Sequence, residues 1–332
     1  MIKTLEFRGF RGIESVSFHD LGRVNLVVGG NNTGKTSVLE AMVLLFGDQN
    51  QVSSLPSLFR QSASKDDDWN NFWPLLASGG SFEEFALNTE VTKIRPEIDK
   101  DGRVSLYRLP PSEGERHGNP IVKIEGKLNG HVDAGHSPTE QRLAILSTAQ
   151  PNPATTSNLF NEIAPLNPDN ETRLEDLLRR SIEPRLRRLR YAKPKGSQKH
   201  LVYVDLGTGP MIPFTQMGQA FARTLHIYCE IFALNPDILI VDEIENGLYY
   251  GGLEDFWKGL IAVLEDQQVQ LFATTHSREC MEAAVRGNRS DNPAPLRYLR
   301  LDRKADDPDK IVGSQFDQKT MATALEFGQE MR

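Results

Sequence analysis

The feature of this sequence that most constrains its fold is a glycine-rich octapeptide between an apolar run and an amphipathic segment. The octapeptide, Gly29–Thr36, fits the pattern G-x-x-x-x-G-K-[ST]. The preceding residues, Arg23–Val28, are mostly apolar and β-branched, as in a buried strand. The following residues, Lys35–Phe46, carry apolar side chains at helical spacing. A strand, a glycine loop and a helix in this order predict an α/β fold with a phosphate-binding loop.

Each residue type in this loop has a chemical reason to be there. Glycines let backbone N–H groups turn inward around phosphates, and Lys35 can reach the β- and γ-phosphates as a point charge. The hydroxyl of Thr36 can ligate Mg²⁺, and the helix that follows directs its N-terminal dipole at the anion. The residues predicted to contact a nucleotide are Gly29, Asn31, Asn32, Thr33, Gly34, Lys35, Thr36 and Ser37.

A second apolar run ends in two acids. Residues Asp237–Val241 are followed by Asp242 and Glu243. Carboxylates at the carboxyl end of a parallel strand face the ligand crevice. We expect Asp242, together with Thr36, to hold Mg²⁺ and Glu243 to orient the attacking water. The alternative is a buried strand followed by an ordinary polar turn.

A third apolar run, Gln268–Thr274, is followed by Thr275, His276 and Ser277. A histidine at this strand end could contact the γ-phosphate and take part in catalysis, although a lone histidine is often structural or merely exposed. The sequence contains no Asn-Lys-x-Asp quartet, the usual guanine-reading element of small GTPases. ATP with Mg²⁺ is therefore the expected cofactor pair.

These three elements, in this order, resemble the ABC-type ATPase superfamily. The resemblance is strongest to stand-alone AAA/ABC-like ATPases related to the OLD (overcoming lysogenization defect) nucleases, with RecF and the structural-maintenance-of-chromosomes proteins more distant. It covers residues 1–50 and 200–285, and within the opening Lys3–Ile13 it implies a basic turn near the nucleotide, which contains Arg11. It implies an α/β ABC-ATPase head with a mixed central sheet, an antiparallel β subdomain and a helical lobe.

The resemblance also implies a signature segment that one protomer donates to its partner. The candidate is Phe214–Ala220, with Thr215 as a helix N-cap and Gly218 near the γ-phosphate of the partner's nucleotide. Related proteins usually carry a second small residue or glycine where Ala220 stands, often after an acid where Gln219 stands, so this sequence departs from the pattern. An ordinary capped core helix is the alternative. A homodimer through the nucleotide sites follows if the segment acts in trans. The family's Q-loop glutamine stays open among Gln49, Gln51 and Gln61.

The chain between the two well-matched parts differs in character. We expect residues 1–50 and 200–332 to form the ATPase core and residues 51–199 to form an inserted β and helical region. Strands are expected at Phe85–Arg95, Arg103–Arg108 and Ile121–Leu128. Turns are expected at Asp101-Gly102 and Asn129-Gly130. Proline-rich stretches at Pro110–Pro120 and Ser147–Pro168 suggest loops.

A dense positive run lies between Arg179 and Lys199, in a chain whose net charge is −7. It is interpreted as a solvated helix face followed by a hairpin. It could also contact the phosphate backbone of nucleic acid or bind an acidic partner protein. A nucleic-acid partner therefore stays open.

Composition narrows the cellular setting. No stretch approaches the 18 or so apolar residues of a membrane span. The two cysteines, Cys229 and Cys280, lack zinc-ligand spacing and fit buried thiols in a reducing compartment. The start of the chain does not resemble a signal peptide, so we expect a cytoplasmic protein.

The motifs predict ATP hydrolysis but not its biological purpose. The resemblance to OLD-related ATPases suggests that the chain is the ATPase subunit of a bacterial, anti-phage defence complex, which acts with a separate effector such as a Toprim-like nuclease. No nuclease is expected in this chain, because the segment after His276 is short for such a domain. The alternative is a DNA-repair or chromosome ATPase that binds DNA directly, although residues 51–200 lack the sustained heptads of such proteins.

Overall fold

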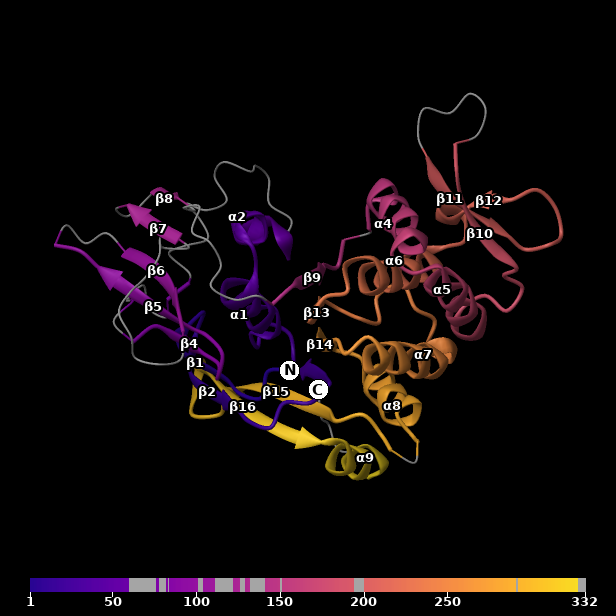
Figure 1. Ribbon diagram of the computed structural model, residues 1–332. Helices are drawn as coiled ribbons and strands as arrows, with labels where there is room; N and C mark the ends of the chain where they lie inside the picture. The colour runs from indigo at the N-terminus through magenta and orange to yellow at the C-terminus, as the bar shows by residue number, and fades with distance from the viewer. Residues whose placement is uncertain are drawn as a thin grey trace. The chain divides into compact units, whose positions relative to one another are not determined.

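The computed structural model describes residues 1–59, 76–77, 82, 84–100, 104–110, 122–125, 129–131, 141–149, 151–193, 200–290 and 292–327. The chain forms two compact units. The first comprises Met1–Leu143, Phe272–His276 and Pro295–Arg332, and the second comprises Ala144–Leu271 and Ser277–Ala294. Both units are therefore built from segments that are distant in sequence (Figure 1).

The first unit is organised around strands of a large mixed sheet, in the order β8-β7-β6-β5-β4-β1-β2-β16-β15-β3-β14. Strands β15 and β3 are parallel, whereas β1 and β2, β15 and β16, and the meander from β4 to β8 pair antiparallel. Every residue of β3 is buried, as expected of a strand covered on both faces. The strands are β1 (Leu5–Phe10), β2 (Ile13–Phe18), β3 (Val24–Val28), β4 (Ala86–Asn88), β5 (Lys93–Ile98), β6 (Val104–Leu109), β7 (Val122–Glu125), β8 (Asn129–His131), β15 (Leu296–Lys304) and β16 (Asp307–Asp317).

Helix α1 (Lys35–Phe46) follows the glycine-rich loop and is buried almost throughout. Its C-terminal carbonyls are capped from the β meander, because the Arg108 guanidinium donates to the carbonyls of Leu44 and Gly47. Burial lowers the pKa of Arg108 to about 10, yet it remains a cation at neutral pH and complements the negative end of the helix dipole. Helices α2 (Gln49–Leu58) and α9 (Gln318–Glu326) also belong to this unit.

The second unit contains the strands β9 (Leu143–Leu146) and β13 (Ile238–Val241) and the start of β14 (Gln270–Thr274), in the order β14-β13-β9. Its helices pack as α4 on α6, α5 on α6 and α7, and α7 on α8. The apolar positions of α6 form much of this core, including Phe221, Leu225, Tyr228 and Phe232. The helices are α4 (Pro153–Leu166), α5 (Pro168–Ser181), α6 (Gln219–Leu234), α7 (Leu253–Asp266) and α8 (Arg278–Gly287).

A separate antiparallel sheet in the second unit carries the basic run. Its strands are β10 (Arg188–Ala192), β11 (Leu201–Asp205) and β12 (Ile212–Pro213). One face, which includes Leu189 and Val204, is buried, and β11 contacts α4. The predicted helix face followed by a hairpin is thus confirmed in α5, β10 and β11.

The predicted fold class is confirmed: an α/β chain with a large mixed sheet, a separate antiparallel sheet and helices. The helix predicted at Lys35–Phe46 has these bounds in the structure. Both cysteines are buried free thiols, as expected, and burial raises the pKa of Cys229. No helix in the part of the chain that the structure describes is both long and apolar enough to cross a membrane.

The loop predicted over Ser147–Pro168 is wrong, because most of that stretch is α4. One of its prolines, Pro153, stands where a helix tolerates it. Pro153 occupies the first turn behind the N-cap Asn152, whose side chain accepts a hydrogen bond from the Ala154 amide, and Pro165 lies in the last turn. Buried Phe160 and Ile163 then pack this helix into the core.

Smaller differences have local causes. The expected strand Phe85–Arg95 is two strands, β4 and β5, separated by a turn in which Thr89 bonds the Thr92 backbone. Asn129 and Gly130 lie in β8 and not in a turn. Asp307 and Asp309 belong to β16, a strand that the sequence did not reveal because its exposed residues include charges.

Several predicted features lie outside the described residues: Gln61, the turn at Asp101-Gly102, the loop at Pro110–Pro120, Lys195 and Lys199. The division into an ATPase core and an insertion over residues 51–199 stays a prediction.

Candidate functional site

The glycine-rich loop leaves the end of β3 and enters α1. Its shape depends on backbone angles that suit glycine: φ is 145° at Gly29 and 89° at Gly34. A Cβ added at Gly29 would lie 2.3 Å from the Leu301 carbonyl oxygen and 2.7 Å from the Thr33 hydroxyl. Only glycine therefore fits at position 29 without a shift of backbone.

The loop is chemically suited to an anion. Among the described residues, the backbone amides of Asn31, Asn32, Thr33 and Gly34 donate no hydrogen bond. Helix α1 begins at the N-cap Gly34 without a side-chain cap and without an acid in its first turn. Unpaired amides at a helix N-terminus bind phosphate groups well.

Lys35 lies over the loop in this structure. Its ammonium donates to the carbonyl oxygens of Gly29, at 2.9 Å, and Gly30, at 2.6 Å. The Thr33 hydroxyl also donates to the Gly30 carbonyl, at 3.0 Å, which tightens the turn. Thr36 is half-buried and Ser37 is buried at the start of α1. The cation thus lies against the segment expected to receive phosphates.

Arg11 lies in a left-handed turn between β1 and β2, with φ of 53°. Its guanidinium forms a buried ion pair with Glu40 of α1, at 2.8 Å. This pair holds the β1–β2 turn against the helix that follows the loop. A direct contact of Arg11 with nucleotide stays a prediction.

His276 follows β14 beside the strand that feeds the loop. The Thr275 amide donates to the Val27 carbonyl at 3.1 Å, so the ends of β14 and β3 are neighbours in the first unit. The His276 side chain is exposed. Its position suits a side chain that faces the same ligand as the loop, and its catalytic role stays a prediction.

The two predicted acids lie at the end of β13 in the second unit. Asp242 is buried, and its amide donates to the Leu146 carbonyl of β9 at 2.8 Å. Glu243 adopts φ of 47°, which is uncommon for a residue with a side chain. Such a backbone conformation costs free energy and is concentrated at functional sites. Thr36 and Asp242, the predicted Mg²⁺ ligands, belong to different units, and their pairing stays a prediction.

Arg223 of α6 was missed by the sequence reasoning. Its guanidinium donates to the main-chain carbonyls of Asp242, at 2.6 Å, and Glu243, at 3.0 Å. Burial lowers its pKa, while Asp242 and neighbouring acids oppose that effect. Arg223 therefore links the helix after the signature segment to the acid pair. A charged residue on an otherwise apolar helix face was the available signal.

The signature segment differs in detail from expectation. Helix α6 begins at Gln219, with Gly218 as its N-cap, and Thr215 lies in the short 3₁₀ helix Phe214–Gln216. The predicted N-cap at Thr215 is therefore wrong, because the chain turns sharply at Gly218, where φ is 90°. Gly218 has no atom within 4 Å of an added Cβ, so this helix N-terminus is open.

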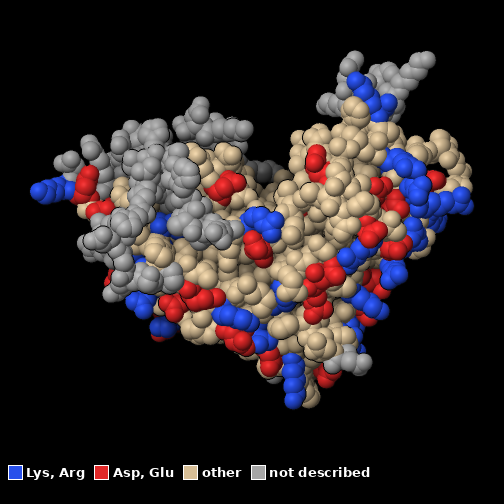
Figure 2. Space-filling view, viewed as in Figure 1, with Lys and Arg blue, Asp and Glu red and all other residues tan. Residues whose placement is uncertain are grey.

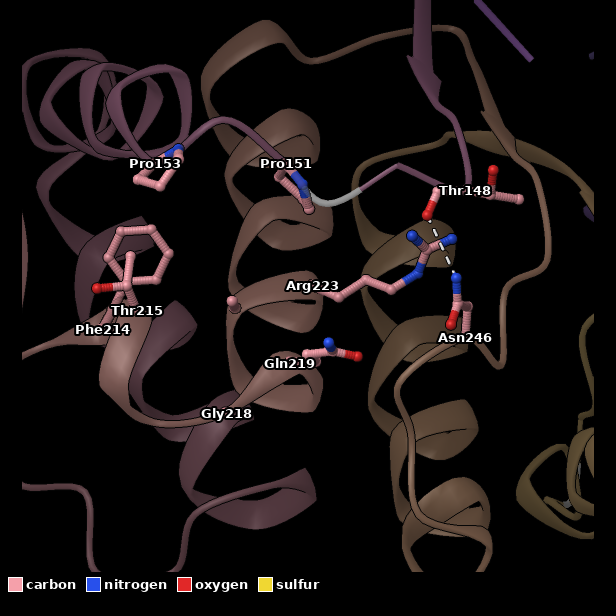
Figure 3. A pocket seen from close by; sticks show the side chains of 10 residues that line it. Thr148, Pro151, Pro153, Phe214, Thr215, Gly218, Gln219, Arg223 and Asn246 are labelled. Carbon is pink, nitrogen blue, oxygen red and sulfur yellow. Dashed lines mark hydrogen bonds between the residues drawn. The ribbon is translucent and has the colours of Figure 1, made fainter. Parts of the chain in front are cut away.

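A pocket of about 140 Å³ lies beside this helix start (Figure 3). Arg223 projects from α6 toward Thr148 and Asn246. The side-chain amide of Asn246 donates to the Thr148 main-chain carbonyl at 3.2 Å. Gly247, the next residue, packs closely on Gln219, since an added Cβ would lie 3.1 Å from the Gln219 Cβ. The residues after Glu243 are thereby fastened to the signature helix within the second unit.

Two of the glutamines proposed for the Q-loop can be compared. Gln51 closes a capping box with Asp48, and its side-chain amide donates to the Leu143 carbonyl at 2.7 Å. Gln49 is exposed at the start of the same helix, α2. The structure therefore gives Gln51 a structural role in the first unit, and the Q-loop assignment stays open.

The sequence profile of the family described as "AAA domain, putative AbiEii toxin, Type IV TA system" matches residues 24–282. Two curated relatives match short segments. The uncharacterized protein MJECL10 of Methanocaldococcus jannaschii is 34% identical over 61 residues, 18% of this chain and 28% of its own length. An ATP/GTP phosphatase of Helicobacter pylori is 32% identical over 74 residues, 21% of this chain and 20% of its own. The matched segments thus span less than a third of either relative.

Solved structures resemble the chain along nearly its whole length. An Smc head bound to the C-terminal winged-helix domain of ScpA has a TM-score of 0.58 at 12% identity and covers 96% of this chain and 99% of its own. An Smc head with an extended coiled coil, bound to the C-terminal domain of ScpA derived from Pyrococcus furiosus, has a TM-score of 0.53 at 11% identity and covers 99% of both chains. At these identities the likeness supports the fold alone.

Proposed function

Because this chain belongs to the AAA-domain family whose profile matches residues 24–282, we propose that it is an ATP-hydrolysing switch protein. ATP is the proposed nucleotide and Mg²⁺ the proposed metal. The observation that carries the proposal is the loop Gly29–Thr36, where unpaired backbone amides and the Lys35 ammonium meet at a helix N-terminus.

The acid pair supports hydrolysis and not binding alone. Glu243 adopts a left-handed backbone conformation. In the turn that follows, the main-chain N–H of Asn246 donates to the Glu243 carbonyl. The Arg223 guanidinium donates to two consecutive main-chain carbonyls, those of Asp242 and Glu243. A backbone held in this way limits where the Glu243 side chain can lie, which suits a carboxylate that orients a water molecule.

A substitution at Glu243 tests the proposal. Glu243→Gln keeps the shape of the side chain but removes the charge that polarises water, so turnover should fall about 100-fold or more. ATP binding should change less than about threefold, since Lys35 and the loop are intact. The matched control is Glu245→Gln, two residues later, which should keep turnover close to wild type. Unchanged turnover in Glu243→Gln, measured by phosphate release, contradicts the assignment.

We further propose that the chain serves as the ATPase subunit of a bacterial defence complex, with a separate effector such as a Toprim-like nuclease. The family description, which refers to a type IV toxin–antitoxin system, supports a two-component arrangement. Co-expression with the genes next to its own, followed by purification, should yield one stoichiometric partner. Recovery of the chain alone, with and without ATP, contradicts this part of the proposal.

Direct nucleic-acid binding is the second candidate function, and the outer face of the β10–β11 hairpin favours it. Arg188 and Arg190 lie two residues apart on β10, exposed on the face opposite buried Leu189. Neither they nor Arg180, Arg187 and Lys193 form an ion pair among the described residues. Figure 2 shows basic side chains gathered, with acids between them, where Figure 1 places α5 and β10.

The two candidates separate in a salt titration. If this face contacts phosphates, Arg188→Ala/Arg190→Ala should weaken binding to a DNA duplex and reduce the slope of log K against log salt by about 1.8. The control, Arg278→Ala/Arg286→Ala, removes two arginines of the same unit that are already paired with carboxylates. Equal affinities for wild type and the hairpin variant exclude this face as a DNA site.

A further inference from the structure

The C-terminal hairpin of the first unit extends past the end of β3 and backs the glycine-rich loop. Strand β15 pairs with β3 as far as Arg300 opposite Val28, and the residues that follow on β15 contact the loop. The Leu301 carbonyl occupies the space that a side chain at position 29 would need. From β16, the Ile311 side chain lies 3.2 Å from where a Cβ of Gly34 would be.

Arg303 connects this hairpin to the loop by a direct hydrogen bond. Its Nη2 donates to the Asn32 carbonyl at 3.0 Å, and its Nη1 donates to the Pro308 carbonyl across the hairpin. No carboxylate pairs with Arg303 among the described residues, although Lys304, its neighbour, is paired with Asp306. The hydrogen bonds that the Arg303 guanidinium donates therefore go to main-chain carbonyls and not to a carboxylate.

The bond has a consequence for the orientation of one peptide unit. A trans peptide is planar, so its N–H points away from its C=O. When Arg303 holds the Asn32 carbonyl, the Thr33 amide is directed to the opposite side of the chain. Thr33 is buried, and its amide donates no hydrogen bond among the described residues. Asn32 has φ of 60°, a conformation that is uncommon for residues with a side chain.

We propose that Arg303 is a positioning residue for nucleotide binding: it fixes the Asn32–Thr33 peptide so that the Thr33 amide is presented to the phosphates. This inference rests on the proposed function, because it assumes that the loop binds a nucleotide. Arg303 acts through the loop and does not contact the ligand. The C-terminal hairpin, which the sequence motifs leave without a role, is then part of the nucleotide site.

Binding of ATP and ADP to variants of the hairpin tests this role. Arg303→Ala should raise the Kd of both nucleotides about 10-fold, the scale expected for a lost hydrogen bond from a charged donor. The turnover number at saturating ATP should change less than about twofold, because a preformed loop contributes to ground and transition states alike. Arg303→Lys should recover part of the affinity.

The matched control is Lys304→Ala, which removes an adjacent positive charge that does not touch the loop. Its Kd for ATP should stay within about twofold of wild type, because screening by salt weakens the effect of an exposed charge. An equal loss in Lys304→Ala and Arg303→Ala would show a general charge effect and overturn the proposal. A Kd within twofold of wild type in Arg303→Ala would also overturn it.

A double-mutant cycle separates positioning from direct contact. Asn32→Gly gives the peptide more freedom, since glycine adopts positive φ without strain but also many other conformations. Loss of Arg303 should therefore weaken ATP binding more in the Asn32→Gly background than in wild type. Equal losses in both backgrounds would show that Arg303 acts independently of the peptide, which contradicts the proposal.

These measurements use nucleotide binding alone, monitored by titration calorimetry of the full chain. If the protein binds ATP but does not hydrolyse it, the proposed function is contradicted. The effect of Arg303 on the Kd can still be measured in that case, because it does not depend on hydrolysis. Melting temperatures of the nucleotide-free variants check folding. If Arg303→Ala lowers both stability and affinity, the double-mutant cycle still decides, because a general loss of folded protein affects both backgrounds equally.

Discussion

Two helices of this protein start at a glycine with a left-handed φ near 90°, and the surroundings of these glycines differ. At Gly34, the N-cap of α1, side chains of Ile13 and Ile311 lie near the position that a Cβ would take. At Gly218, the N-cap of α6, an added Cβ would meet nothing within 4 Å. The first glycine is enclosed by its own unit, and the second is open to solvent.

The difference indicates two ways in which a helix N-terminus can be prepared for an anion. The loop Gly29–Thr36 is held by a carbonyl of Leu301, by Arg303 and by the following helix, so its amides are already arranged. The segment at Gly218 has a fixed start, because Gly247 packs on Gln219, but its outer side is uncovered. We infer that the first site binds its ligand alone and that the second requires a surface from outside its unit.

The largest expected effect tests whether the enclosed loop binds nucleotide. Lys35→Ala removes a cation that now lies on the loop carbonyls and would face the phosphates. The Kd for ATP should rise by about 100-fold or more, because charge-assisted hydrogen bonds are lost. Lys304→Ala, in the same unit, is the control. If titration calorimetry shows wild-type affinity for ATP in Lys35→Ala, the loop Gly29–Thr36 is not the nucleotide site, and the comparison of the two helix starts as anion sites fails.

A pair of alanine substitutions compares the two environments directly. Gly29→Ala forces a Cβ to within 2.3 Å of the Leu301 carbonyl oxygen and should destabilise the protein by about 3 kcal/mol. In Gly218→Ala the added Cβ meets no atom within 4 Å. The free energy of unfolding should therefore fall by only about 1–2 kcal/mol, because alanine disfavours this positive φ. Urea unfolding of both variants measures the difference, and equal losses would contradict the contrast between the two glycines.

The smallest expected effect on ATP binding concerns the open glycine. If Gly218 serves a second protomer, ATP should shift the Glu243→Gln protein toward a dimer, seen by light scattering. Gly218→Asp in that background should abolish the shift, because a carboxylate would face the γ-phosphate, while ATP binding stays near normal. Gly218→Asn has a side chain of nearly the same size without the charge and should retain more of the dimer.

A monomer mass with and without ATP, at concentrations where ATP is bound, would show that the open helix start is not used in this way. Equal behaviour of the Asp and Asn variants would show a steric effect and not an electrostatic one. The unchanged monomer mass would place the covering surface elsewhere than on a second copy of this chain.

The sequence predicted the parts of this protein that depend on local order along the chain. A loop pattern between an apolar run and a helical repeat specified β3, the glycine loop and α1 with its bounds, because φ-permissive glycines and side-chain periodicity are local properties. The acid pair after β13 and the strand before His276 were found for the same reason. Helix α4 was missed, because prolines at tolerated helix positions look like loop signals in a sequence.

Only the tertiary structure decided which distant residues hold these motifs. Arg223 reaches the carbonyls of Asp242 and Glu243, and Arg303 reaches the Asn32 carbonyl across 271 positions of sequence. A main-chain carbonyl carries no residue identity, so no pattern of side chains announces such a partner. The sequence by itself therefore determined where the glycine-rich loop and the acids lie, whereas packing decided how they are held, because hydrogen bonds to the backbone depend on proximity that only the folded chain creates.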